Sequence, residues 1–179
     1  MRSSLFLVWF AASAALLSAA LADAADSSRE RALQRAFPAA AVERRTAYLS
    51  AAQLTTANEN ADSTTEIESR IWTYYVGSNS AGVVGFAYFD RLIIRAAPAV
   101  IMTVVAPDGR LRSIEAVEFN GPPERAPTRA FLKGLRGMSL GSEIRLGAGV
   151  DGISGATYTS MTLVDAARRA LAIHSVLHP

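Results

Sequence analysis

The chain has 179 residues, a formal net charge of +2 and no cysteine. The lack of cysteine excludes disulfides, thiolate nucleophiles, zinc–thiolate sites, iron–sulfur clusters and attached c-type haem. The basic residues are spread along the sequence, so neither a stripe for nucleic acid nor a polybasic membrane patch is expected.

The N-terminal segment has the pattern of a secretory signal peptide. Residues 2–22 place one arginine before a long apolar run that ends in small residues. Ala20 and Ala22, or Ala22 and Ala24, form an A-x-A cleavage pattern. We therefore expect a signal peptide over residues 1–24 and a periplasmic or otherwise extracytoplasmic protein. An uncleaved membrane anchor is the alternative, because about 20 apolar residues suffice to span a bilayer.

The remaining residues, 25–179, are enough for one domain with its own core. They begin with a predicted helix over residues 28–36 and a short strand over 44–50. A second helix is expected over residues 50–61, begun by Ser50 and dissolving into a polar run.

From residue 70 the apolar pattern changes to a period of two, which is typical of strands. Strands are expected, in chain order, over residues 70–76, 83–89, 91–96, 99–106 and 110–119. Turn residues at 77–82 and the Pro-Asp-Gly sequence at 107–109 favour hairpins. The strands should therefore form an antiparallel sheet.

Helical patterns return in the last third of the chain. A helix over residues 128–137, closed by Gly134 or Gly137, is followed by a glycine-broken connection and a final helix over about 159–176. The buried face of the final helix is expected to hold Leu163, Ala166, Ala167, Ala170, Ile173 and Leu177, with Asp165, Arg168 and Arg169 outward. The sum is a single α+β domain, an antiparallel twisted sheet packed by helices.

The loop before the final helix, residues 151–160, reads DGISGATYTS. Thr159 or Ser160 is a good N-cap for the helix, and the glycines permit conformations that other residues avoid. The free backbone N–H groups at a helix start favour an anion. A phosphate or carboxylate pocket and a capped helix with nothing bound are both consistent with this spacing.

The same ten residues resemble the flavinylation motif of the FMN-binding domain found in the C and G subunits of the sodium-pumping and Rnf-type electron-transport complexes, and in small exported proteins. That motif has an acid, two variable residues, Ser/Thr-Gly-Ala-Thr, one variable residue and a Ser or Thr. The matching residues are Asp151, Ser154, Gly155, Ala156, Thr157 and Thr159. A weaker resemblance covers most of residues 36–175. The loop over residues 121–131 departs from it, because Glu124 is its only acid.

The resemblance implies an FMN-binding domain over residues 25–179 whose attachment loop leads into the C-terminal helix. FMN would be joined covalently to Thr157 by a phosphoester, taken from FAD by a flavin transferase. The protein would be an electron carrier more than a self-contained catalyst. Its partners would be redox proteins, which can be membrane-bound, and no nucleic-acid partner is expected. Leu140 and Ser142 lie where the family brings backbone near the flavin ring.

Several alternatives stay open at this point. Asp151 is either a recognition residue for the transferase or an acceptor that orders the loop as an Asx-turn at Gly152. Tyr158 either lies against the flavin ring or is buried under the helix, and burial is favoured. In place of flavin attachment, the loop could serve a binding or structural module that takes an anionic ligand or partner.

Two histidines near the C-terminus raise the question of a metal site. His174 and His178 have the i, i+4 spacing of metal ligands on a helix. No third ligand is evident, so no metal is expected, and a frayed, solvated C-terminus is favoured. A hydrolase built on Ser154 or Ser160 would lack a base, because both histidines lie at the far end of the final helix.

Overall fold

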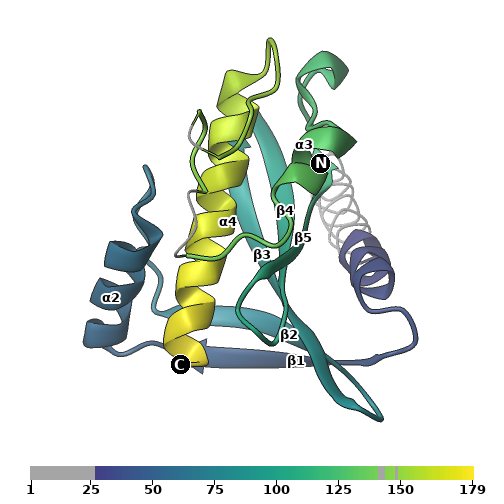
Figure 1. The fold of residues 1–179 in the computed structure, drawn as a ribbon, viewed down its shortest axis with the longest axis vertical. Helices are drawn as coiled ribbons and strands as arrows, with labels where there is room; N and C mark the ends of the chain where they lie inside the picture. Colours follow the sequence, from purple (N-terminus) through teal and green to yellow (C-terminus); the bar gives the residue numbers. More distant parts are fainter. Residues whose placement is uncertain (1–26, 141–143, 148) are drawn as a thin grey trace, which may run out of the picture.

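The structure is a computed structural model that describes residues 27–140, 144–147 and 149–179 (Figure 1). The predicted signal peptide and Ser142 lie outside the described residues. Within these ranges no helix combines the length and apolarity needed to cross a membrane. Residues 27–36 are helical, as predicted, and the chain turns at 37–40 to enter the sheet.

A five-stranded antiparallel sheet forms the centre of the fold and confirms the predicted α+β class. Its strands are neighbours in chain order: β1 (Ala41–Tyr48), β2 (Ile71–Asn79), β3 (Gly82–Ile94), β4 (Ala97–Val105) and β5 (Leu111–Phe119). The hairpins predicted at 77–82 and 107–109 are both present.

The two strands predicted over residues 83–89 and 91–96 are one strand, β3, and the separation was wrong. β4 supplies a partner for every residue of β3 from Phe86 to Ile94, so pairing continues through Asp90. The chain reverses only at Arg95, whose φ of 58° is in the left-handed region used by tight turns.

The sheet bends sharply between β2 and β3. Their pairing ends at Tyr74 and Tyr88, so the start of β2 and the last part of β3 diverge. In Figure 1, β1 and β2 cross beneath the strands β3, β4 and β5, which rise above them. This bend gives the sheet one strongly concave face.

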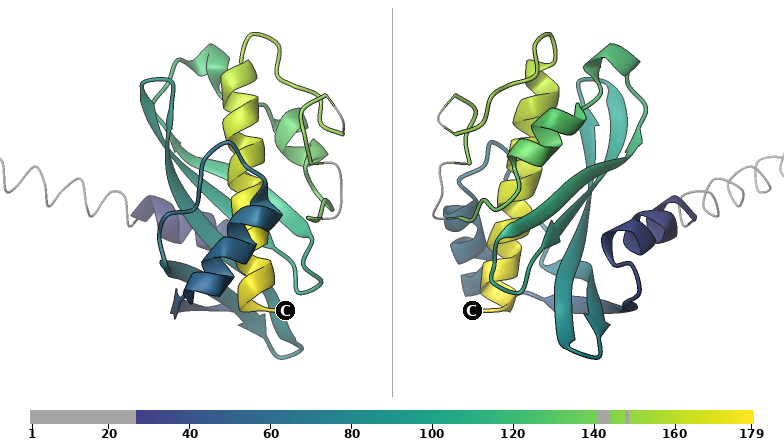
Figure 2. Two further views of the ribbon diagram at one scale, coloured as in Figure 1. Left: turned by 90° about the vertical axis from the view of Figure 1, so that its left-hand side faces the viewer. Right: turned by 45° about the vertical axis from the view of Figure 1, so that its right-hand side comes forward.

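Helix α4 (Thr157–Leu177) lies across that face, with α2 (Ala51–Ala61) packed beside it (Figure 2). Ser50 caps α2 through a complete capping box with Gln53, as its position predicted, and α2 continues through Ala61 instead of dissolving. The helix over residues 27–36 covers the opposite face of the sheet.

Shorter helical segments join β5 to the motif loop. A 3₁₀ turn, η1 (Pro123–Arg125), follows β5, and α3 (Arg129–Gly134) begins where Thr128 accepts a hydrogen bond from the backbone N–H of Phe131. The helix predicted over 128–137 is thus confirmed in a shorter form.

Two arginines predicted to point outward from α4 are buried, and that prediction was wrong. Arg168 is 8% exposed and Arg169 is 5% exposed. Arg168 donates to the backbone oxygens of Ala61 and Ile144, and Arg169 pairs with Asp90 of β3 at 2.5 Å. The prediction from the amphipathic pattern took α4 to have one buried face, whereas the helix has neighbours on several sides.

The C-terminal turn of α4 is packed, and the frayed, solvated end expected from the sequence was wrong. His174 is 4% exposed, and its Nδ1 lies 2.9 Å from the hydroxyl of Tyr88. The ring of His178 lies 4.4 Å from Phe86, centroid to centroid. The bend of the sheet places these aromatic rings under the last turn. The described ranges contain no group of three potential metal ligands.

Burial lowers the pKa of His174 from 6.5 to about 4, with His178 adding a smaller effect in the same direction. Burial, and then Arg45, also lowers the pKa of His178. The unfolded chain takes up a proton on His174 near pH 6.5, and the folded protein does so only near pH 4. The unfolded state therefore binds more protons in this window, so stability falls as pH falls.

We predict that the melting temperature declines progressively between pH 6.5 and about 4. His174→Gln keeps a hydrogen-bonding side chain but cannot titrate, so this decline should become shallower. Thermal unfolding followed by circular dichroism across this range measures the effect, with the less buried His178→Gln as a comparison. An unchanged slope in His174→Gln would contradict the assignment.

Candidate functional site

The DGISGATYTS stretch forms the loop before α4 and the first turn of that helix (Figure 1). The helix begins at Thr157, with Ala156 in the N-cap position and no side-chain cap. The predicted caps, Thr159 and Ser160, were therefore wrong. Gly155, at a φ of 74°, turns the chain so that the helix starts earlier than expected.

The hydroxyls of the two predicted caps tie the helix start to its surroundings. Thr159 donates to the backbone oxygen of Arg125 at 2.8 Å. Ser160 accepts from the backbone N–H of Ile153 at 2.8 Å and lies 3.2 Å from the oxygen of Ala156. Both residues are buried, so neither presents a hydroxyl to solvent.

Thr157 has the opposite environment. It is exposed, and its hydroxyl makes no hydrogen bond within the described part of the chain. The backbone N–H groups of Thr157, Tyr158 and Thr159 likewise find no acceptor among the described residues. A helix start left open in this way carries a partial positive charge and free donors directly beside an exposed nucleophilic oxygen.

A cleft of about 290 Å³ opens beside Thr157. Three segments line it: the β3–β4 turn at residues 94–98, residues 119–122 and Arg125 after β5, and the motif at residues 155–159. Its charged lining residues are Arg95 and Arg125, and no described acid lines it. The cleft therefore favours an anion.

Arg95 and Tyr158 form one wall of the cleft. The guanidinium carbon of Arg95 lies 4.5 Å from the centre of the Tyr158 ring, a cation–π arrangement. Tyr158 is 57% exposed, so the favoured expectation that it is buried was wrong. Tyr158 is in the first turn of α4 and faces the β3–β4 hairpin instead of the sheet. Sequence reasoning missed Arg95, because no local motif marks it and only the hairpin brings it to the loop.

The remaining predicted residues are only partly gathered at this cleft. Gly155 and Ala156 line it, while Ser154 and Asp151 are exposed on the preceding loop. The Asp151 carboxylate accepts no hydrogen bond from any described residue, so the Asx-turn at Gly152, one of the two alternatives for this residue, is not observed. Leu140 is half-buried and packs against the main core instead of lining the cleft.

Comparison with protein families identifies the segment that contains this site. Residues 96–172 match the family model of the FMN-binding domain. The match starts in the β3–β4 turn and extends through the DGISGATYTS loop into α4. The weaker resemblance over residues 36–95 lies outside the match. A search of curated proteins found no match to the chain.

We predict that Gly155→Ala destabilises the protein by about 1–2 kcal/mol, because a side chain at a φ of 74° is strained even though the space around it is open. Gly152→Ala is the matched control in the same loop: it has equal space and no positive φ, so its free energy of unfolding should be nearly unchanged. Urea denaturation compares the two. Equal effects would show that the left-handed turn does not matter.

Proposed function

We propose, from the premise that this chain is an FMN-binding domain protein, that its FMN is bound covalently through a phosphoester to Thr157. We further propose that the protein carries electrons outside the cytoplasm. The observation that carries the attachment proposal is an exposed threonine hydroxyl at the open, uncapped start of α4, on a cleft whose charges are two arginines.

The residues of this cleft fit the phosphate of FMN. A phosphodiester on Thr157 would be an anion at the helix start, where three N–H donors have no acceptor within the described residues. Arg95 and Arg125 supply positive charge on the facing walls. Arginine suits this task because its planar group donates several hydrogen bonds to phosphate oxygens.

The accessibility of the motif hydroxyls selects Thr157 among them. Thr159 and Ser160 are 2% and 0% exposed, and both are engaged in hydrogen bonds. Ser154 is exposed but precedes Gly155, outside the helix start. Among the described hydroxyls of the motif, only that of Thr157 has no hydrogen bond and lies beside the free backbone N–H groups at the start of α4. It is therefore the hydroxyl best placed for modification.

Attachment requires a transferase, because none of the described residues that line this cleft is a base able to activate a hydroxyl. The Thr157 oxygen forms a bond to the flavin-side phosphorus of FAD, the pyrophosphate bond breaks, AMP leaves and the threonine proton passes to a base of the transferase. Exposed Ser154 and Gly155 beside a small Ala156 leave room for that enzyme to approach. Asp151, exposed and unengaged among the described residues, is available for recognition by it.

Bound FMN supplies the one- and two-electron chemistry, and the protein supplies attachment, orientation and charge. Covalent attachment suits a protein outside the cytoplasm, where a dissociated flavin is not easily recaptured. The redox partners would be proteins, some of them membrane-bound.

We predict that Thr157→Ala abolishes covalent flavin when the protein is produced beside an active flavin transferase, because alanine has no hydroxyl. The stability cost should be within about 0.5–1 kcal/mol, since the side chain is exposed and unengaged. Flavin fluorescence in a denaturing gel, with peptide mass mapping, gives the measurement.

Thr162→Ala is the matched control in the second turn of α4, where the hydroxyl only donates to the backbone oxygen of Tyr158. It should retain full flavin. Flavin mapped to Ser154 would show that the wrong hydroxyl was assigned. Unflavinylated wild-type protein would favour the alternative, a module of the same fold that uses the loop for an anionic ligand.

The location is a separate proposal that rests on residues 1–24. We predict that exported protein begins near Asp23 or Ala25, because the A-x-A pattern follows the apolar run. N-terminal sequencing and intact mass of the exported material measure this. A chain that retains Met1 would instead be membrane-anchored.

A further inference from the structure

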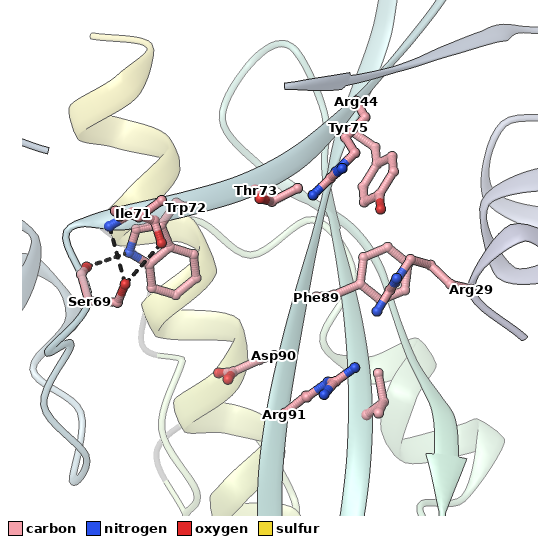
Figure 3. Close-up of a pocket in the computed structure, with 11 residues that line it drawn as sticks. Arg29, Arg44, Ser69, Ile71, Trp72, Thr73, Tyr75, Phe89, Asp90 and Arg91 are labelled. Atoms are coloured by element: carbon pink, nitrogen blue, oxygen red, sulfur yellow. Dashed lines mark hydrogen bonds between the residues drawn. The ribbon is translucent and has the colours of Figure 1, made fainter. Parts of the chain in front are cut away.

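A second cavity, a groove of about 360 Å³, lies where β2 bends away from β3, and it is called the second groove below. It shares no lining residue with the cleft beside Thr157. Its walls come from the helix over residues 27–36 and from β1, β2, β3 and β4, as Figure 3 shows. Its size is within the range of small-molecule sites.

Three arginines, each from a different element, line this groove: Arg29, Arg44 and Arg91. Arg44 and Arg91 make no hydrogen bond or ion pair with any described residue. Among the described residues that line the groove, the one acid, Asp90, is paired with Arg169 at 2.5 Å. In Figure 3, Asp90 points toward α4 and Arg91 away from it. The groove thus has positive charge, on Arg44 and Arg91, that the described residues do not neutralise, and this charge attracts anions.

Aromatic rings form the floor between these charges. Tyr75 and Phe89 meet edge to face, with centroids 5.5 Å apart. The guanidinium carbon of Arg29 lies 5.4 Å from the centre of the Phe89 ring. Both rings are half-buried, so each keeps surface that a ligand can contact. Flat rings beside the guanidinium groups of Arg44 and Arg91, which have no partner among the described residues, match a ligand that is both planar and anionic.

We propose that this groove binds a phosphate monoester that also carries an aromatic ring system, the class that includes nucleoside monophosphates. Arg44 and Arg91 hold the phosphate, because guanidinium groups bind phosphate oxygens through paired, charge-assisted hydrogen bonds. The aromatic part of the ligand lies against Tyr75 and Phe89. The site is independent of the flavin-attachment loop, so the proposal does not rest on the proposed function.

The test is a titration of the purified protein with adenosine 5′-monophosphate, followed by calorimetry and by NMR shifts of the Tyr75 and Phe89 signals. Adenosine and inorganic phosphate each supply half of the ligand, so each should bind about tenfold more weakly or worse. Shifts confined to other parts of the molecule, or no binding at all, would overturn the proposal.

Arg44→Gln/Arg91→Gln should weaken binding of the nucleotide by about tenfold or more. Arg129→Gln/Arg136→Gln is the matched control, because it removes the same charge from exposed residues near α3, outside the groove. Phe89→Leu should weaken binding of the nucleotide but not of inorganic phosphate. If both double variants lost nucleotide affinity equally, the loss would come from the change in net charge, and the proposed site would be overturned.

The flavin state separates this proposal from the previous one. Equal affinity in flavin-bearing wild type and in flavin-free Thr157→Ala protein supports a separate site. Binding by the flavin-free form alone would show that the groove belongs to the flavin site. If wild-type protein carries no flavin, the proposed function fails. The titration with nucleotide still decides whether the groove binds its ligand, because the groove does not depend on flavin.

Discussion

The burial of two adjacent arginines on α4 is the constraint on which the rest of the structure depends. A buried guanidinium is costly unless its donors are satisfied. Arg168 meets this need with backbone oxygens of Ala61 and Ile144, and Arg169 with the carboxylate of Asp90. Each partner belongs to a different segment, so the pair orients α4 against the end of α2, the loop before the motif and β3 at once.

That orientation decides what the N-terminal end of α4 can do. Thr159 and Ser160 face inward and bind neighbouring backbone, which fixes the first turn. Thr157, on the outer side of the same turn, is left exposed beside free N–H donors. The site is therefore a surface feature on a rigid support, which suits a residue that another enzyme must reach.

β3 connects the separate features of the molecule. One end leads into the turn that places Arg95 over Tyr158. Its middle holds the Asp90 that pairs with α4, while its other face contributes Phe89 and Arg91 to the second groove. Near its start, Phe86 and Tyr88 pack under His174 and His178. Continuous pairing with β4 makes these positions parts of one framework.

The sequence by itself determined the α+β class, the hairpins, the Ser50 cap and the motif around Thr157, because each depends on residues close together in the chain. Only the tertiary structure decided that α4 starts at Thr157, that Tyr158 is exposed beneath Arg95, and that Arg168 and His174 are buried. The burial of His174 against Tyr88 and the position of Tyr158 under Arg95 depend on partners more than 60 residues away in the chain. A periodic pattern marks one buried face of a helix, and it cannot register neighbours that surround the helix on several sides.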